Sequence, residues 1–263
     1  MTFLTPHLHF TSSSISSSAR SPLPPAATTV LLSDTISAPA DFVLLHFVAT
    51  QLKATKSVLL VGCGEGVDHY KAISKKIGIS LDQPNFKFHD ALSAQSQSSA
   101  PSDLRNLFDS IISLVERQQK ENSSPSDGPE SEVMVVLDDL SALLWMGAEL
   151  ETVGRFVRAL QASSRKLNFN IVYLVHTIPS SASAVPEDEL FRLLHPSADL
   201  WIRVQGLQSG RSGDVSGELS FIPSPLLDSD EGFPRTEPGK ELQYKLGDSG
   251  VTFFPKGTGQ GFL

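Results

Sequence analysis

Short runs of strand-forming residues alternate with longer amphipathic segments along the middle of this chain. The runs lie at residues 30–32, 57–61, 86–90, 132–137 and 170–176. The amphipathic segments lie at residues 41–53, 67–78, 103–119 and 150–167, where apolar residues recur at intervals of three and four. Continuous apolar runs are typical of strands covered on both faces, and intervening helices make the crossovers that parallel strands need. The alternation therefore predicts an α/β fold with a mostly parallel sheet and helices on both faces.

The pattern changes near residue 200. Segments 200–207, 217–223 and 241–257 have strand character and are separated by short connections, with Gly247 to Gly250 as a hairpin turn. We therefore predict extra antiparallel strands at the C-terminus. With 263 residues, of which 40% are hydrophobic, the chain can build a large core, and we predict a single domain over residues 30–263.

The first 29 residues are rich in Ser, Thr and Pro, and Arg20 is their one Lys or Arg residue. A transit peptide has a similar composition, although it usually carries several arginines. The favoured interpretation of residues 1–29 is a disordered or loosely attached lead-in.

Charge and cysteine content exclude several classes of protein. The formal net charge of −8 argues against nucleic-acid binding by bulk electrostatics, so any RNA contact must be local. The single cysteine, Cys63, excludes an internal disulfide and a cysteine-cluster zinc site. The histidines lack the spacing of metal ligands. His176, at the end of the run at 170–176, is expected to face the loop side of the sheet, where it could line an interface. No apolar run approaches the length of a membrane span. We expect a soluble protein in a reducing compartment, without a metal.

Residues 132–147 form an apolar strand that ends in Asp138 and Asp139 and continues into a helix. Nucleotide hydrolases have such a strand, together with a glycine-rich loop and a lysine that hold the phosphates. Here the connection between the first strand and its helix contains Ser33, Asp34 and Asp41 but neither Gly nor Lys. The layout of a hydrolase is therefore predicted without its phosphate loop. Asp138 and Asp139 are interpreted as structural, capping the next helix, with metal binding as the alternative.

The glycines at positions 62, 64 and 66 suggest a different function. The stretch "VLLVGCGEG" resembles the first motif of S-adenosylmethionine-dependent methyltransferases, and Asp90 could then hold ribose hydroxyls. Against this stand Leu60, where such a strand carries an acid, and the extra strand and helix before it. A methyltransferase using the Gly62–Gly66 turn remains the alternative function.

Several segments together resemble subunit six of the Elongator complex. The resemblance rests on the lysine-free first loop followed by "FVLLHFVATQLK", and on "HYKAISKKIGISL", "VMVVLDDLSALLWMG", "IVYLVH" and "YKLGDSGVTFFPKG". They span the chain from about residue 30 to residue 257. Two features depart from the family: the glycine-rich "GCGEG", and the proline and glycine content of residues 223–239, an apparent insertion.

The resemblance implies a RecA-like fold without Walker residues, and hence no enzymatic activity, catalytic residue or cofactor. It implies a heterohexameric ring of subunits four, five and six that binds tRNA and supports the Elongator catalytic core, which modifies the wobble uridine at carbon 5. The implied location is the cytoplasm, with the nucleus as an alternative. Candidate tRNA contacts are Arg165, Lys166, Arg203 and Arg211, for which solvated surface charge is the alternative interpretation.

Overall fold

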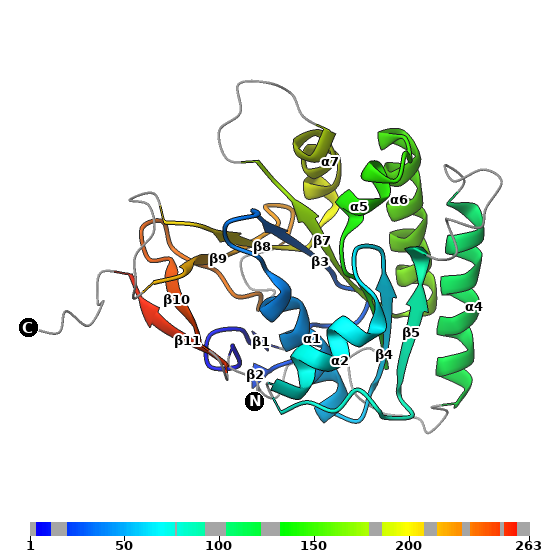
Figure 1. Cartoon of the computed structure of the whole chain (residues 1–263), viewed down its shortest axis with the longest axis horizontal. Helices are drawn as coiled ribbons and strands as arrows, with labels where there is room; N and C mark the ends of the chain where they lie inside the picture. The colour runs from blue at the N-terminus through cyan, green and yellow to red at the C-terminus, as the bar shows by residue number, and fades with distance from the viewer. Residues whose placement is uncertain are drawn as a thin grey trace, which may run out of the picture.

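The computed structural model describes residues 4–11, 20–76, 78–92, 104–121, 132–178, 186–207, 215–227, 232–247 and 250–256. Within these residues the main sheet has nine strands in the order β11-β10-β9-β8-β3-β7-β6-β4-β5 (Figure 1). The parallel strands are β3 (Thr29–Asp34), β4 (Ser57–Gly62), β5 (Phe86–Asp90), β6 (Val133–Leu137), β7 (Asn170–His176) and β8 (Leu200–Gln205).

Three antiparallel strands extend the sheet beyond β8. They are β9 (Gly217–Pro223), β10 (Leu242–Gly247) and β11 (Gly250–Pro255). Gly247 pairs with Gly250, so β10 and β11 form a hairpin whose two turn residues lie outside the described residues. The predicted mostly parallel sheet with antiparallel strands at its C-terminal side is confirmed.

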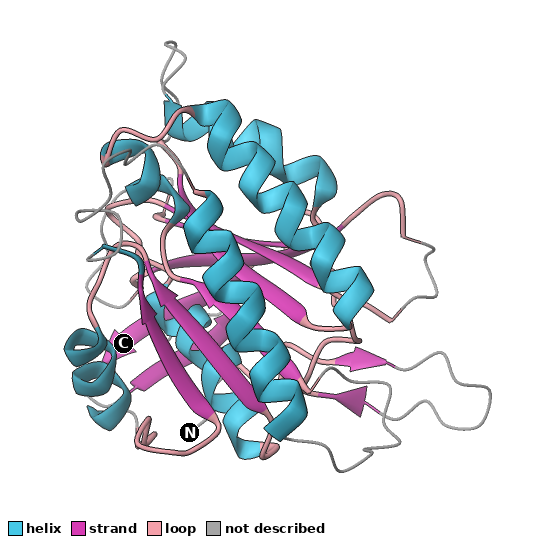
Figure 2. Cartoon of the chain, turned by 90° about the vertical axis from the view of Figure 1, so that its right-hand side faces the viewer, coloured by secondary structure: helices cyan, strands magenta, loops and turns pink. Residues whose placement is uncertain are grey.

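Helices cover both faces of the sheet (Figure 2). One core cluster contains buried residues of α1 (Asp41–Lys53) and α2 (Val67–Lys76). The other contains those of α4 (Arg105–Glu121), α5 (Leu140–Trp145), α6 (Leu150–Leu167) and α7 (Pro186–Leu194). A short 3₁₀ helix, η1 (His195–Ser197), follows α7. Every residue of β3, β4 and β6 is buried because each strand contributes side chains to both clusters.

Residues 4–11 and 20–29 are packed on the domain, contrary to the prediction that residues 1–29 are disordered or loosely attached. Leu4, Leu8 and Phe10 are at most 1% exposed and belong to the same core cluster as α1. A two-stranded sheet of β1 (Phe10–Thr11) and β2 (Arg20–Ser21) holds this segment in place. A few apolar side chains set among serines and prolines have no helical or strand period, which is why sequence patterning missed their burial.

The proline- and glycine-containing segment after β9 packs against the same N-terminal residues. Phe233 meets Phe10 edge to face at 5.5 Å, and Thr236 exchanges hydrogen bonds with the backbone of Phe221 in β9. The described part of the apparent insertion therefore packs, through Phe233, against the core cluster that contains α1. None of the helices in the described residues is both long and apolar enough to cross a membrane.

Candidate functional site

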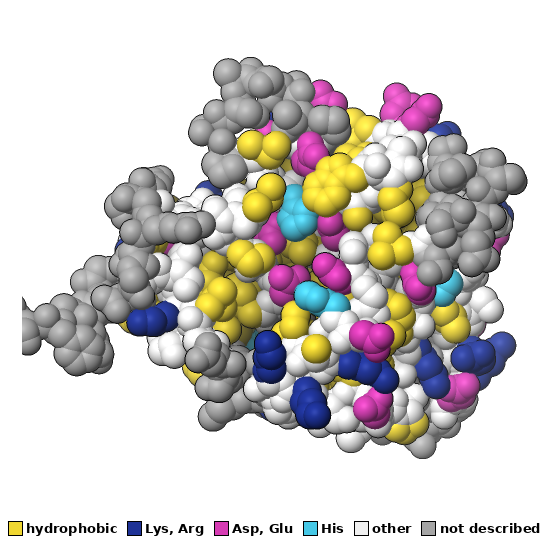
Figure 3. Space-filling model, viewed as in Figure 1, with side chains coloured by type: hydrophobic (Ala, Val, Ile, Leu, Met, Phe, Trp, Pro, Cys, Tyr) yellow, Lys and Arg dark blue, Asp and Glu magenta, His cyan; other side chains and the backbone are white. Residues whose placement is uncertain are grey.

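The polar residues singled out from the sequence meet at the carboxyl ends of the parallel strands. Asp34 ends β3, the glycine turn follows β4, Asp138 and Asp139 follow β6, and His176 ends β7. Ligands bind at this edge in open α/β sheets because the loops and helix N-termini converge there. Figure 3 shows acidic, histidine and hydrophobic side chains gathered on this face of the molecule.

Asp34 stands at the end of β3, at the start of the loop that leads to α1. A nucleotide hydrolase would bind phosphate in this loop. Its carboxylate is buried, and one oxygen accepts a hydrogen bond of 2.8 Å from the backbone N–H of Ala40. Its other oxygen forms a hydrogen bond with Nδ1 of His176. Asp41 lies in the first turn of α1, where burial and then the charge of Asp34 raise its pKa. The protein's own carboxylates therefore make this loop acidic, which opposes phosphate binding.

Asp138 fills the glycine turn after β4. Its carboxylate accepts hydrogen bonds from the backbone N–H groups of Cys63 (2.5 Å), Gly64 (3.0 Å) and Glu65 (3.0 Å). It also accepts one of 2.9 Å from the hydroxyl of Tyr70. Burial is the largest cause raising the pKa of Asp138, and these four donors oppose it. The turn thus binds an anion, but that anion belongs to the chain itself.

The glycines of this turn are explained by packing within the chain. A Cβ atom at Gly62 would lie 2.5 Å from both the carbonyl oxygen of Glu65 and the ring of Phe88. At Gly64 it would lie 3.2 Å from Cβ of Asp139. Asp90, the expected ribose partner, is exposed at the end of β5. Because Asp138 already uses the N–H groups that a ligand would need, the geometry opposes a methyltransferase site in this turn.

Asp139 has a different role from its neighbour. It is the N-cap of α5, and one carboxylate oxygen accepts a 2.8 Å hydrogen bond from the backbone N–H of Ser141. The other oxygen lies 3.2 Å from Nε2 of His176. The capping interpretation therefore applies to Asp139, whereas Asp138 binds the glycine turn.

His176 lies between two carboxylates, Asp34 and Asp139. Hydrogen bonds to Asp139 and to Asp34 raise the pKa of His176 to about 10, so the ring carries both protons at neutral pH. We call Asp34, Asp139 and His176 the strand-end cluster; it joins the ends of β3, β6 and β7. Both ring nitrogens already face carboxylates, and within the described residues no group of three or more His, Cys, Asp or Glu side chains could hold a metal ion.

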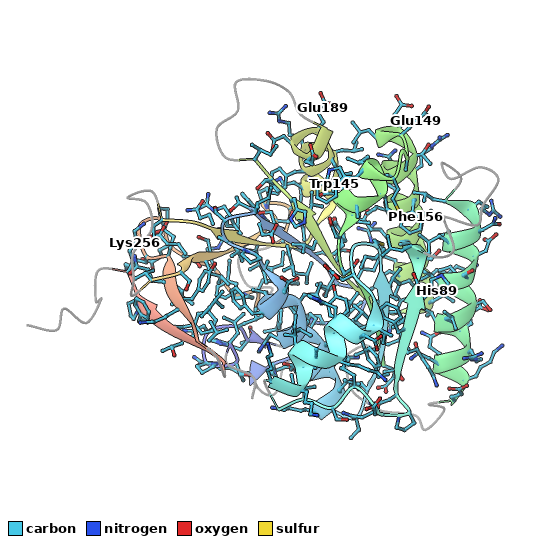
Figure 4. The ribbon with its side chains drawn as sticks, in the orientation of Figure 1. His89, Trp145, Glu149, Phe156, Glu189 and Lys256 are labelled. Atoms are coloured by element: carbon cyan, nitrogen blue, oxygen red, sulfur yellow. The ribbon has the colours of Figure 1, made fainter. Side chains whose placement is uncertain are left out.

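A tryptophan covers this histidine from the solvent side. The rings of Trp145 and His176 stack at 5.6 Å with an interplanar angle of 13°. Trp145 is the last residue of α5, and Figure 4 shows it beside α7. Its Nε1 donates a 2.6 Å hydrogen bond to Glu187 of α7. The sequence indicated that His176 would face the loop side of the sheet, but pairing it with Asp34 and Trp145 needed the tertiary structure.

Three exposed hydrophobic residues lie next to the strand-end cluster, one by contact and two along the chain. Ile36, Trp145 and Ile178 are 89%, 59% and 41% exposed. Ile36 lies in the loop that Asp34 begins, and Ile178 is two residues beyond His176. We call these three residues the apolar rim. Exposed hydrophobic groups gathered in one place commonly mark a protein-binding surface.

The candidate RNA-binding residues do not form one patch. Arg165 and Lys166 are exposed in the last turn of α6, which leads into the beginning of β7. Arg203 lies in β8, in register with Ser33 near the carboxyl end of β3. It is therefore at the carboxyl ends of the parallel strands, whereas Arg165 and Lys166 are near the amino end of β7. Arg211 lies outside the described residues. Ser33 is buried, and its hydroxyl accepts a 2.8 Å hydrogen bond from Nε1 of Trp201.

Comparisons with known proteins agree with this architecture. A family model described as "Elongation complex protein 6" matches residues 13–93 and 85–248. The human Elongator complex protein 6 is 28% identical over 237 residues, which cover 82% of this chain and 86% of the human protein. The protein of the same name from Danio rerio is 27% identical over 251 residues, covering 89% and 92%.

One solved structure shows the same fold at low sequence identity. A KaiC-like protein from the archaeon Pyrococcus horikoshii superposes with a TM-score of 0.59 at 11% identity, covering 89% of this chain and 91% of that protein. This similarity confirms the predicted RecA-like arrangement of strands and helices. At this identity it concerns the fold alone.

Proposed function

Because the chain belongs to the Elongation complex protein 6 family, we propose that it is a non-catalytic subunit of the Elongator complex. Its role is assembly: it joins subunits four and five in a heterohexameric ring. That ring binds tRNA and supports the catalytic core, which modifies the wobble uridine at carbon 5. We place this activity in the cytoplasm, with the nucleus as a second location.

The observation that carries the proposal is a RecA-like fold whose nucleotide-binding edge is filled by its own side chains. Asp34 and His176 bind each other where a phosphate loop would lie, and Asp138 occupies the glycine turn. Such a domain keeps the shape of a hydrolase subunit without a place for the γ-phosphate and its lysine.

The apolar rim supports binding to a partner protein at the same edge. Ile36, Trp145 and Ile178 are exposed here, and the side chains of the neighbouring strand-end cluster are already paired with one another. An interface core is typically apolar and aromatic, with few unpaired charges. The rim therefore fits a contact with a neighbouring ring subunit better than it fits a highly charged ligand.

Co-expression with subunits four and five, followed by mass determination by light scattering, tests the assembly. A particle of six subunits is the expected result, and the chain purified alone is the control. A monomer that ignores both partners would remove the assembly proposal.

An assay of phosphate release from ATP tests the non-catalytic role separately. The chain alone should release no more phosphate than the buffer does. Hydrolysis that Asp139→Ala abolishes would instead show that a working catalytic site exists at this edge.

A further inference from the structure

A pocket of about 760 Å³ opens beside the strand-end cluster, and none of the three cluster residues lines it. It is formed by the ends of β3, β7 and β8 together with α7, and Figure 1 shows these three strands side by side. Its size falls within the roughly 300–1,000 Å³ typical of small-molecule sites. The pocket is therefore large enough for a ligand of about nucleotide size.

Arg203 supplies a cation with unused hydrogen-bonding capacity. Its Nε is buried and has no hydrogen-bond partner in the described part of the chain. The guanidinium lies 5.6 Å from the ring centre of Trp201, and none of the carboxylates in the described residues forms a salt bridge with it. A buried donor without an acceptor is unfavourable, and most such groups in native proteins find a partner. Arg203 is thus prepared for an anionic acceptor inside the pocket.

A second guanidinium and several hydroxyl groups share this pocket. Arg192 of α7 is exposed, and among the described residues it forms no ion pair. The hydroxyls of Thr35 and Ser37, 3.2 Å apart, also line the pocket. Asp188 is the one acid in the lining, and its carboxylate accepts a 3.1 Å hydrogen bond from the backbone N–H of Ile178. Two arginines and several hydroxyls lining one pocket are well suited to a phosphate group.

Aromatic side chains form a rigid wall of the same pocket. Trp201 is held by its hydrogen bond to Ser33, and the ring of Phe191 lies 5.0 Å from it. His195 packs edge to face against Trp201 at 4.9 Å. A fixed indole offers apolar, polarisable surface to a planar heterocycle, and stacking of bases on aromatic side chains is common in nucleotide recognition.

We propose that this pocket binds a nucleoside phosphate, with its phosphate paired to Arg203 and Arg192 and its base against the Trp201 and Phe191 wall. The unit is a ribonucleotide, either free or part of an RNA strand. No bond is made or broken. The site includes Ser33, Thr35 and Ser37 from β3 and the loop that follows it, but none of the strand-end cluster residues. It does not depend on the proposed ring assembly.

Fluorescence of Trp201 tests the binding directly. The chain has two tryptophans, so full-length protein carrying Trp145→Phe reports Trp201 alone. This protein is titrated with AMP, with a short single-stranded RNA and with inorganic phosphate. Saturable quenching by AMP is expected if the ligand is a free nucleotide, and by RNA alone if it is part of a strand. Equal affinity for inorganic phosphate and AMP would overturn recognition of a nucleoside.

Arginine variants in the same background assign the binding to the pocket. Arg203→Gln should weaken binding by about 10- to 100-fold, because a charge-assisted hydrogen bond and its charge are lost. Arg192→Gln should weaken it less. Arg155→Gln, at an exposed position of α6 that does not line the pocket, is the matched control and should bind like the parent.

Two further outcomes would overturn the proposal: no saturable quenching by either nucleotide ligand, or equal weakening by Arg155→Gln and the pocket variants. Thermal unfolding monitored by circular dichroism shows whether each variant folds. If Arg203→Gln does not fold, Arg192→Gln decides, because its side chain is exposed. The mass of the complex with subunits four and five is measured separately, so failure of nucleotide binding and failure of assembly are distinguishable.

Discussion

At the scale of single residues, the chain uses its own charged groups where related folds bind ligands. Asp138 accepts four hydrogen bonds from the glycine turn and Tyr70, and Asp34 and Asp139 share the proton-bearing ring of His176. A buried charge is tolerated only with such partners. The stability of the fold should therefore fall when one partner of these pairs is removed.

The stability of the protein should depend on the protonation of His176. Its pKa is raised to about 10 by hydrogen bonds to Asp139 and Asp34, so the folded chain binds this proton more tightly than the unfolded chain does. The stabilisation is complete below the ordinary histidine pKa of about 6.5 and disappears as the pH rises through the folded value. The free energy of unfolding should fall from about pH 7 to pH 10 in the parent and fall less in His176→Gln.

Denaturant unfolding across that pH range measures the effect. His69→Gln is the matched control, because His69 lies at the surface, 3.7 Å from Glu65. Parallel pH profiles for the parent and His176→Gln would show that the strand-end cluster does not hold an extra proton.

Asp138→Ala should destabilise the fold strongly. It leaves three backbone N–H groups and the Tyr70 hydroxyl without their acceptor, at a cost of about 3 kcal/mol. For a protein of this size this is a fall in Tm of about 6–12 °C. Added formate should recover part of the loss, because it places a carboxylate in the vacated site.

Scanning calorimetry measures the Tm of each variant. Sodium chloride at equal ionic strength is the control for the effect of formate. Asp82→Ala removes an exposed acid that pairs with Lys71, and its Tm should barely change. A Tm for Asp138→Ala equal to that of Asp82→Ala would mean that the glycine turn does not need an internal anion.

At the scale of elements, local pattern was a reliable guide to the sheet and to most of its helices. It missed α7 and was a poor guide to the N-terminus. The strands at 57–61 and 170–176 were predicted from their apolar runs, and the structure places β4 and β7 there. Residues 4–11 have no comparable period, yet Leu4, Leu8 and Phe10 are buried. This segment packs against distant parts of the chain: Phe10 contacts Phe233, and His7 contacts Phe253.

The N-terminal segment should therefore stabilise the domain. Leu8 is fully buried, and Leu8→Ala should lower the free energy of unfolding by about 2–5 kcal/mol through lost burial and a residual cavity. Ile36→Ala is the control, since Ile36 is 89% exposed and its truncation should have almost no effect. Denaturant unfolding compares the two, and equal midpoints would show that residues 4–11 are dispensable for the fold.

At the scale of the whole molecule, the apolar rim is the surface through which we expect the subunit to assemble. Ile36→Asp with Ile178→Asp should reduce affinity for the partner subunits by about 10-fold or more, because charges would be placed in a dry interface. Leu226→Asp is the control, as Leu226 is 85% exposed but lies apart from the rim in sequence and follows β9. Size-exclusion chromatography of the complexes at decreasing concentration measures the change in affinity. If the parent, the double variant and Leu226→Asp dissociate from their partners at the same concentration, the interface lies elsewhere.

The sequence by itself determined the α/β alternation, the antiparallel C-terminal strands and the absence of a lysine-bearing phosphate loop. Hydrophobic period and loop composition are local properties, so they can be read along the chain. Only the tertiary structure decided that Asp34 meets His176 across 142 positions, that Asp138 fills a glycine turn 75 positions away, and that the N-terminal leucines are buried. Those contacts depend on strand order and on packing between distant segments, and no local period encodes either.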